Sequence, residues 1–123
     1  MALLRRNFAR SEFACKGNSC CGHSAPVDEA LLDALQALRD YIGQAIHINS
    51  GFRCNVHNAN VGGSPSSMHR LGKAADIVAE LMHPAELADA AERIPILQRG
   101  GIGRYSTFVH VDTRGVKARW SGR

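Results

Sequence analysis

The chain has 123 residues, of which 45% are hydrophobic and 21% are charged. This length fits a single domain over residues 1–123, and the apolar fraction is too high for a disordered tail. The formal net charge of +4 is a mild basic excess that is spread along the chain without a basic recognition helix, so we expect no nucleic-acid partner.

The first 23 residues are rich in Cys, Gly and Ser and predict an irregular segment that wraps the domain. The arginines Arg5 and Arg6 follow the short apolar start, and no apolar run of about 7–15 residues precedes a small-residue cleavage site. We therefore expect no signal peptide. No stretch approaches the ~20 apolar residues that a membrane-spanning helix needs, and we expect no membrane partner.

A helix after this segment is the clearest predicted element. Ser24 fits its N-cap, Pro26 fits its first turn, and Gly43 is a natural stop. Apolar side chains recur at helical spacing and predict a face that packs on the core: Val27, Leu31, Leu35, Leu38 and Ile42.

Further along the chain the elements become shorter. The pattern predicts strands over residues 45–48, 74–79 and 108–112, and a short helix that ends at Gly62 and Gly63. A second helix begins at Pro84 and ends near Ile94, and Gly100 to Gly103 marks a tight passage. Helices and strands mix without regular βαβ alternation. This favours an α+β fold with helices packed on a small antiparallel sheet.

The cysteines are Cys15, Cys20, Cys21 and Cys54. Because a chain of this length builds a core without disulfide staples, one loose pair or free buried thiols is the first interpretation. The alternative is a structural zinc bound by Cys15, by Cys20 or Cys21, by Cys54 and by His23, although the spacing matches no zinc ribbon or finger.

Polar residues interrupt two of the predicted strands. Asp76 lies within AADIVA and His110 lies between Val109 and Val111. A carboxylate buried there must be neutralised, paired or bound to a metal. His69 lies on a glycine-bearing turn just upstream. Two imidazoles and one carboxylate are a donor set of catalytic zinc sites. Spacing alone leaves a zinc site and hydrogen-bonded core histidines as alternatives.

These motifs resemble those of the M15 zinc peptidases, the D-alanyl-D-alanine carboxypeptidase and murein endopeptidase group. SMHRLGKAADI resembles the family signature S-x-H-x-x-G-x-A-x-D, and NSGFRC resembles its S-G-[YF]-R segment. GGIGRYSTFVHVDTRG resembles the segment of the third metal ligand. The resemblance spans residues 49–120 and implies the hedgehog/DD-peptidase fold.

The resemblance also implies an activity and a site. It assigns His69, Asp76 and His110 as ligands of a catalytic Zn2+, and Arg53 and Ser67 as substrate-binding residues. A structural role for Arg53 and a loop-orienting role for Ser67 stay open. The implied function is that of a zinc metallopeptidase which hydrolyses peptide bonds in bacterial peptidoglycan stem peptides or crosslinks. The alternative is a catalytically inactive, zinc-containing binding module of the same fold.

The catalytic base departs from the family pattern. The positions that hold it in other branches are Thr107 and Phe108 here, and neither side chain can serve. Asp112 is the nearest remaining carboxylate and shares a strand face with His110. We predict that Asp112 handles the proton of the zinc-bound water. Support of a ligand histidine is the alternative role, and His57 is a further candidate base.

Two further expectations concern the position of Cys54 and the oligomeric state and location of the protein. Cys54 directly follows the Arg53 motif, and Cys15 ends a segment similar to the family's start, so we expect Cys54 to lie close to residues 15–21 and to pin the N-terminus to the core. We also expect a monomer that stays cytoplasmic until release, or that is phage-associated like an endolysin, and that acts on the cell wall.

Overall fold

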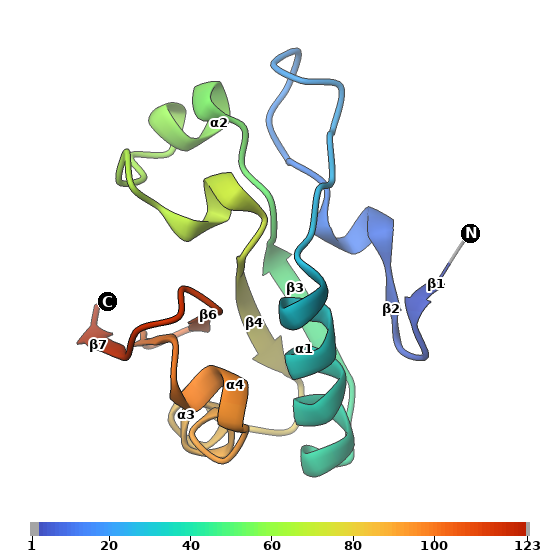
Figure 1. Ribbon diagram of the computed structural model, residues 1–123, viewed down its shortest axis with the longest axis vertical. Helices are drawn as coiled ribbons and strands as arrows, with labels where there is room; N and C mark the ends of the chain where they lie inside the picture. Colours follow the sequence, from blue (N-terminus) through green and yellow to red (C-terminus); the bar gives the residue numbers. More distant parts are fainter. Residues whose placement is uncertain (1–2, 123) are drawn as a thin grey trace.

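The computed structural model describes residues 3–122, and a five-stranded sheet organises them (Figure 1). The strand order is β3–β4–β6–β5–β7, and all neighbours are antiparallel except β5 and β7, which are parallel. The predicted α+β class is confirmed, and the predicted antiparallel sheet gains one parallel edge. The strands are β3 (Ile46–Ser50), β4 (Ala74–Ala79), β5 (Gly101–Arg104), β6 (Val109–Asp112) and β7 (Ala118–Ser121).

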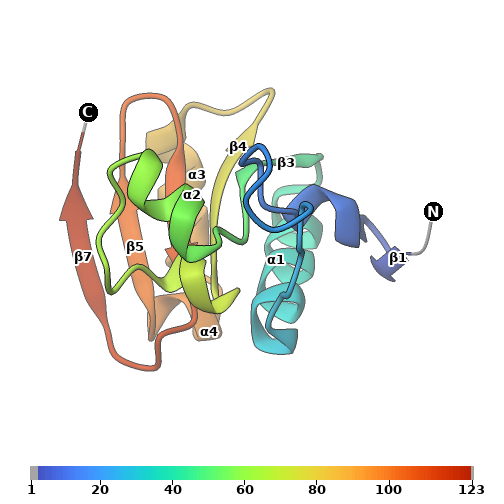
Figure 2. The ribbon, with the colours of Figure 1, turned by 90° about the horizontal axis from the view of Figure 1, so that it is seen from above.

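The two faces of this sheet have different surroundings. Ala75 and Ile77 of β4 pack with Val109 and Val111 of β6 into the hydrophobic core, which α1 (Glu29–Ile42), α3 (Pro84–Ala91) and α4 (Pro95–Gln98) complete. The alternate residues of β4 and β6 point to the other face, beside α2 (Asn55–Asn60) and the 3-10 helix η2 (Met68–Leu71). Figure 2 shows α2 on one side of the sheet, with α3 and α4 behind it.

Helix α1 ends as predicted but begins later. Gly43 has a positive φ of 70° and stops the helix. The N-cap is Asp28, so Ser24 and Pro26 lie before the helix rather than at its start. Asp28 is held extended because its N–H donates to the Gly72 carbonyl at 2.8 Å and its carboxylate accepts from Thr113 at 3.1 Å. These contacts tie the helix start to the turn before β4, and local sequence does not reveal them.

The core side of α1 gives a direct stability prediction. Leu35 has no exposed surface and lies at the centre of the core cluster. We expect Leu35→Ala to lower the free energy of unfolding by about 2–5 kcal/mol, because apolar burial is lost and a cavity remains. Leu81→Ala is the matched control, since Leu81 is 81% exposed and should change the value by less than about 0.5 kcal/mol. Denaturant titration of both variants measures this, and equal effects would contradict the assignment of the core.

Other predicted elements need correction. The second helix begins at Pro84 as predicted but ends at Ala91, and a separate helix that was not predicted, α4, begins at Pro95 after an extended Ile94. The glycine passage is strand β5: a side chain at Gly101 would overlap the Asp112 carboxylate, and one at Gly103 would overlap the Trp120 ring. These glycines therefore provide space rather than a turn. Part of the segment predicted to be irregular is regular: residues 3–13 include β1 (Leu3–Arg5), β2 (Phe8–Ala9) and the 3-10 helix η1 (Arg10–Phe13).

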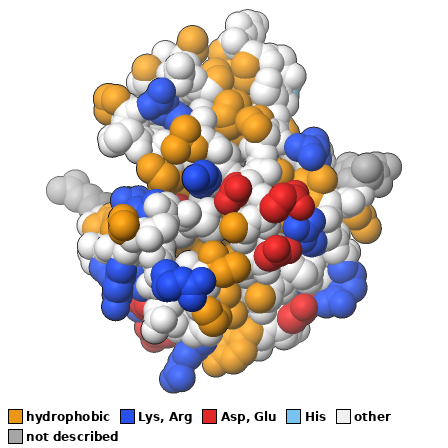
Figure 3. Space-filling view, viewed as in Figure 1, with side chains coloured by type: hydrophobic (Ala, Val, Ile, Leu, Met, Phe, Trp, Pro, Cys, Tyr) orange, Lys and Arg blue, Asp and Glu red, His pale blue; other side chains and the backbone are white. Residues whose placement is uncertain are grey.

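Figure 3 shows one face, on which Lys and Arg side chains are spread among acidic and uncharged ones. Among residues 3–122, no helix combines the length and the apolar character needed to cross a bilayer.

Candidate metal centre

The three predicted metal ligands converge on one point. Asp76 of β4 and His110 of β6 are register partners, so their side chains leave the same face of the sheet. His69 reaches them from η2. Its Nε2 lies 3.2 Å from Asp76 Oδ1, and Nδ1 of His110 lies 3.2 Å from the same oxygen. All three residues are buried, and their donor atoms lie within 4.8 Å of one another.

Both imidazoles are held with a ring nitrogen free to bind a metal. Nδ1 of His69 lies 2.7 Å from the Gly51 carbonyl, which can only accept, so Nδ1 donates to that carbonyl and Nε2 is the nitrogen that faces Asp76. Nε2 of His110 lies 2.7 Å from Asp112 Oδ2, which leaves Nδ1 facing the same point. Metal-binding histidines are oriented by such hydrogen bonds on the opposite nitrogen. Two nitrogens and one carboxylate oxygen fit Zn2+ with a fourth position for water.

The charge of the centre also suits a cation. Burial by itself would raise the pKa of Asp76, but hydrogen bonds with His110 and His69 outweigh it and hold that pKa well below its usual range. Burial would lower the pKa of His110, whereas hydrogen bonds with Asp112 and Asp76 raise it above its ordinary value. The carboxylate of Asp76 is therefore ionised at neutral pH and suited to bind a metal cation.

The turn that carries His69 is fixed at both ends. Ser67 is the N-cap of η2, and its hydroxyl accepts the His69 N–H at 3.2 Å. Gly72 ends the turn with a φ of 70°, and a side chain there would meet the Pro26 carbonyl oxygen. The chain then enters β4 and reaches Asp76. Ser67 thus orients the ligand turn, and it also lines the pocket described below.

Arg53 lies beside the carboxylate ligand. Its Nη2 donates to Asp76 Oδ2 at 3.3 Å, and its Nε donates to Ser50 at 3.3 Å. The backbone N–H of Arg53 donates to the His69 carbonyl at 3.0 Å, so this residue is linked to two of the ligands. The side chain is 17% exposed and faces the pocket.

Asp112 lies behind His110 and not at the pocket. It is fully buried, and its carboxylate accepts hydrogen bonds from His110, from the Gly101 N–H at 2.9 Å and from Arg114 Nη2 at 2.7 Å. Burial would raise the pKa of Asp112, but His110 and Arg114 hold it well below its usual range. Asp112 lies on the strand face of His110 as predicted, but it is not among the described residues that line the pocket, where a group that takes a proton from a metal-bound water would lie.

The other candidate base is also absent from the pocket. His57 of α2 packs beside Gly17, where an added Cβ would lie 2.9 Å from His57 Cβ. It is not among the described residues that line the cavity over the centre.

A pocket of about 480 Å3 opens over the three ligands. One wall is aromatic: the rings of Tyr105 and Phe108 stack at 4.3 Å, and Trp120 Nε1 donates to the Tyr105 hydroxyl at 2.9 Å. The Trp120 ring lies 4.9 Å from the His110 ring, and the Arg114 guanidinium lies 5.0 Å from the Trp120 ring centre. Sequence reasoning missed this wall and Arg114. The only signal was the single Trp of the chain.

Comparison with known proteins agrees with the geometry. A sequence profile of the family Peptidase M15 matches residues 6–112. The zinc D-Ala-D-Ala carboxypeptidase of Streptomyces albus G is 37% identical over 89 residues. That match covers 71% of this chain and 35% of the Streptomyces protein, so the chain spans about a third of the length of this relative. The mixed α+β architecture is consistent with the hedgehog/DD-peptidase fold. The chain belongs to the M15 peptidase family.

Proposed function

We propose that the chain is a zinc-dependent peptidase that hydrolyses peptide bonds in bacterial peptidoglycan stem peptides or crosslinks. The observation that carries the proposal is the convergence of His69, Asp76 and His110 at the base of an open pocket. Family membership and the name of the Streptomyces relative support the same chemistry. Peptidoglycan lies outside the cytoplasmic membrane, so the proposed enzyme acts on the wall after release or as part of a phage.

Three side chains would hold the metal, through His69 Nε2, Asp76 Oδ1 and His110 Nδ1. Zn2+ bound there would polarise the scissile carbonyl and lower the pKa of its water toward neutrality. The protein orients the two imidazoles through the Gly51 carbonyl and the Asp112 carboxylate.

Arg53 is the proposed anchor for the substrate. Its guanidinium is part of the pocket wall next to Asp76, and a planar fork of N–H donors suits a peptide carboxylate or carbonyl. Ser67, Ser64 and Ser66 line the same cavity and offer hydroxyl groups to a peptide backbone. The aromatic wall of Tyr105, Phe108 and Trp120 would pack against the alkyl parts of the peptide.

Arg53→Lys tests this anchor. Lysine keeps the charge but loses the fork, so we expect kcat/KM to fall by about 10–100-fold, mainly through KM, as the loss of a charged hydrogen bond of ~1.5–3 kcal/mol predicts. Zinc content should stay at the wild-type level. Arg99→Lys is the control, because Arg99 is exposed and outside the pocket. A fall in kcat alone, or parallel losses in both variants, would argue against substrate anchoring.

We propose that Asp112 positions His110 rather than moving a proton. It receives His110 Nε2 and is itself held by Gly101 and Arg114. This arrangement fixes the ring so that Nδ1 points to the metal. The assignment revises the catalytic role that strand-face reasoning predicts for Asp112.

One observation favours the rival function, a zinc-containing binding module without turnover. Among the described residues that line the pocket, the carboxylate and imidazole groups all belong to the proposed metal ligands, so the lining offers no further carboxylate or imidazole as a base. The same pocket would bind a stem peptide through Arg53 and the aromatic wall. Both functions need the metal centre, and only one of them changes the bound peptide.

The two functions separate in one assay. Purified protein at full zinc occupancy is incubated with isolated peptidoglycan and with a stem peptide that ends in D-Ala-D-Ala, and mass spectrometry identifies the products. Free D-Ala would identify a carboxypeptidase, and cleaved crosslinks would identify an endopeptidase. Binding of the intact peptide without any product would overturn the peptidase proposal and support the binding module.

A further inference from the structure

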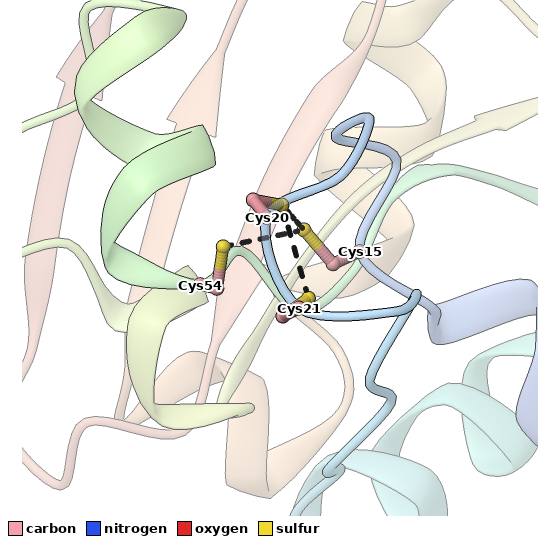
Figure 4. A group of neighbouring side chains, drawn as sticks. All are labelled: Cys15, Cys20, Cys21 and Cys54. Carbon is pink, nitrogen blue, oxygen red and sulfur yellow. Dashed lines mark hydrogen bonds between the residues drawn. The ribbon is translucent and has the colours of Figure 1, made fainter.

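Four cysteine sulfurs gather at a point outside the proposed active site (Figure 4). Cys15, Cys20 and Cys21 lie on the loop between η1 and α1, and Cys54 is the N-cap of α2. Cys15 Sγ lies 3.8 Å from Cys20 Sγ and 3.8 Å from Cys54 Sγ, and the sulfurs of Cys20 and Cys21 are 3.9 Å apart. All four sulfurs lie within 4.8 Å of one another. The expectation that Cys54 lies close to residues 15–21 is confirmed.

These separations match the edges of a metal–sulfur tetrahedron. Zinc–thiolate bonds of about 2.3 Å place the sulfurs of a tetrahedral site about 3.8 Å apart. The four side chains point inward to one shared space, from two segments that are 33 or more residues apart in the chain. An iron–sulfur cluster would distribute the cysteines over several irons rather than bring them to one point.

The loop is folded around these sulfurs by polar contacts. The Cys15 N–H donates to the Ser24 carbonyl at 2.8 Å and closes the loop, and the Ser24 hydroxyl donates to the Cys21 carbonyl at 3.0 Å. The His23 ring lies 2.8 Å from the Cys15 carbonyl, so it is engaged in the loop rather than turned to the sulfurs. A side chain at Gly17 would collide with Cys20 Sγ. The donor set is therefore four cysteines and excludes His23.

Two residues of the loop other than glycine adopt left-handed backbone conformations. Ser19 has a φ of 59° and His23 a φ of 60°, and Gly22 between them has a φ of 67°. Left-handed conformations are unfavourable for residues with a Cβ and persist where the surroundings impose them. Here they reverse the chain on both sides of Cys20 and Cys21, which brings both adjacent side chains to the same point.

We propose that Cys15, Cys20, Cys21 and Cys54 bind a second Zn2+ with a structural role. Four thiolates around one ion, with no open position, are the pattern of structural rather than catalytic zinc. The proposal rests on the sulfur geometry alone and does not depend on the proposed peptidase activity.

A zinc ion at this site would stabilise the segment that carries Gly51 and Arg53 beside the proposed active site. Cys54 follows Arg53, and the segment just before it supplies the Gly51 carbonyl that orients His69. The Phe52 N–H donates to the Phe13 carbonyl at 2.9 Å, so this segment already contacts the N-terminal region. A metal bound by Cys54 and by the cysteines of the loop would hold these two segments together. It would also keep Arg53, the neighbour of Cys54, in place beside the turn that carries His69.

The test uses the full chain with the other centre removed. The double variant His69→Ala/His110→Ala is purified under reducing conditions, and its zinc is measured by inductively coupled plasma mass spectrometry. We expect one zinc per chain, and intense thiolate-to-cobalt charge-transfer bands in the near ultraviolet when Co2+ replaces it. Absence of stoichiometric zinc, or a cobalt spectrum without these bands, would overturn the proposal.

A matched variant and a mass measurement complete the test. Cys15→Ser/Cys54→Ser in the otherwise unchanged chain should lower the zinc content from two ions to one and lower the melting temperature. If this variant does not fold, the cobalt spectrum of the histidine variant decides the question alone. Each disulfide bond would lower the mass of the unreduced chain by two hydrogens. Two disulfide bonds among the four cysteines of the purified protein would overturn the proposed zinc site.

Discussion

His110→Ala should abolish hydrolysis of the stem peptide while the domain stays folded. The variant loses one of the three proposed metal ligands. It also loses the side chain that contacts both Asp76 and Asp112 among the described residues. Metal catalysis supplies several kcal/mol of transition-state stabilisation, so we expect kcat/KM to fall by ~10³-fold or more. The hydrophobic core lies on the opposite face of the sheet, so the cooperative unfolding transition should persist.

Zinc content and turnover are measured together on this variant. Zinc bound at the histidine centre should be lost along with activity, whereas zinc at the cysteine site stays. His47→Ala is the control, because His47 of β3 is exposed and should leave both quantities unchanged. Wild-type turnover in His110→Ala would remove this residue from the mechanism and the metal centre with it.

Asp112→Asn should weaken zinc binding rather than block the chemical step. The asparagine keeps the shape of the side chain but removes the charge that His110 Nε2 and Arg114 share. Loss of a hydrogen-bond partner behind a metal ligand typically costs about 10–100-fold in metal affinity. We therefore expect low activity at limiting zinc and recovery of most activity when zinc is in excess.

The competing role for Asp112 gives the opposite pattern. If it moves a proton, zinc content stays normal and kcat falls by ~10²–10⁴-fold at any zinc concentration. Asp89→Asn is the control, since the Asp89 side chain is 74% exposed and outside the pocket. Full activity with wild-type zinc affinity would mean that Asp112 neither positions His110 nor takes part in the reaction.

The sequence predicts the elements that carry strong local signals. The apolar periodicity of residues 31–38 and the stop at Gly43 define most of α1, and AADIVA and VHVD define β4 and β6. Two of the proposed metal ligands can be predicted for the same reason, because Asp76 and His110 are polar residues inside buried strands. The register that places them opposite each other depends on pairing across 34 residues, which periodicity does not show.

What the sequence misses depends on contacts between distant segments. Strand β5 looks like a turn because its glycines make room for Asp112 and Trp120, and β7 is short, polar and paired in parallel. Strand periodicity correctly places Asp112 on the same face as His110. It does not tell which ring nitrogen of His110 faces the metal, and that choice puts Asp112 behind the ligand rather than beside the substrate.

The most direct test of the account is the zinc dependence of peptide hydrolysis by the purified chain. Chelator-treated protein, with its metal content measured, is titrated with Zn2+ while release of D-Ala or cleavage of crosslinks is followed. We predict no hydrolysis without metal and activity that rises in proportion to zinc bound by His69, Asp76 and His110. Full hydrolysis by metal-free protein, or none by protein with a fully occupied centre, would contradict the assignment of this chain as a zinc peptidase.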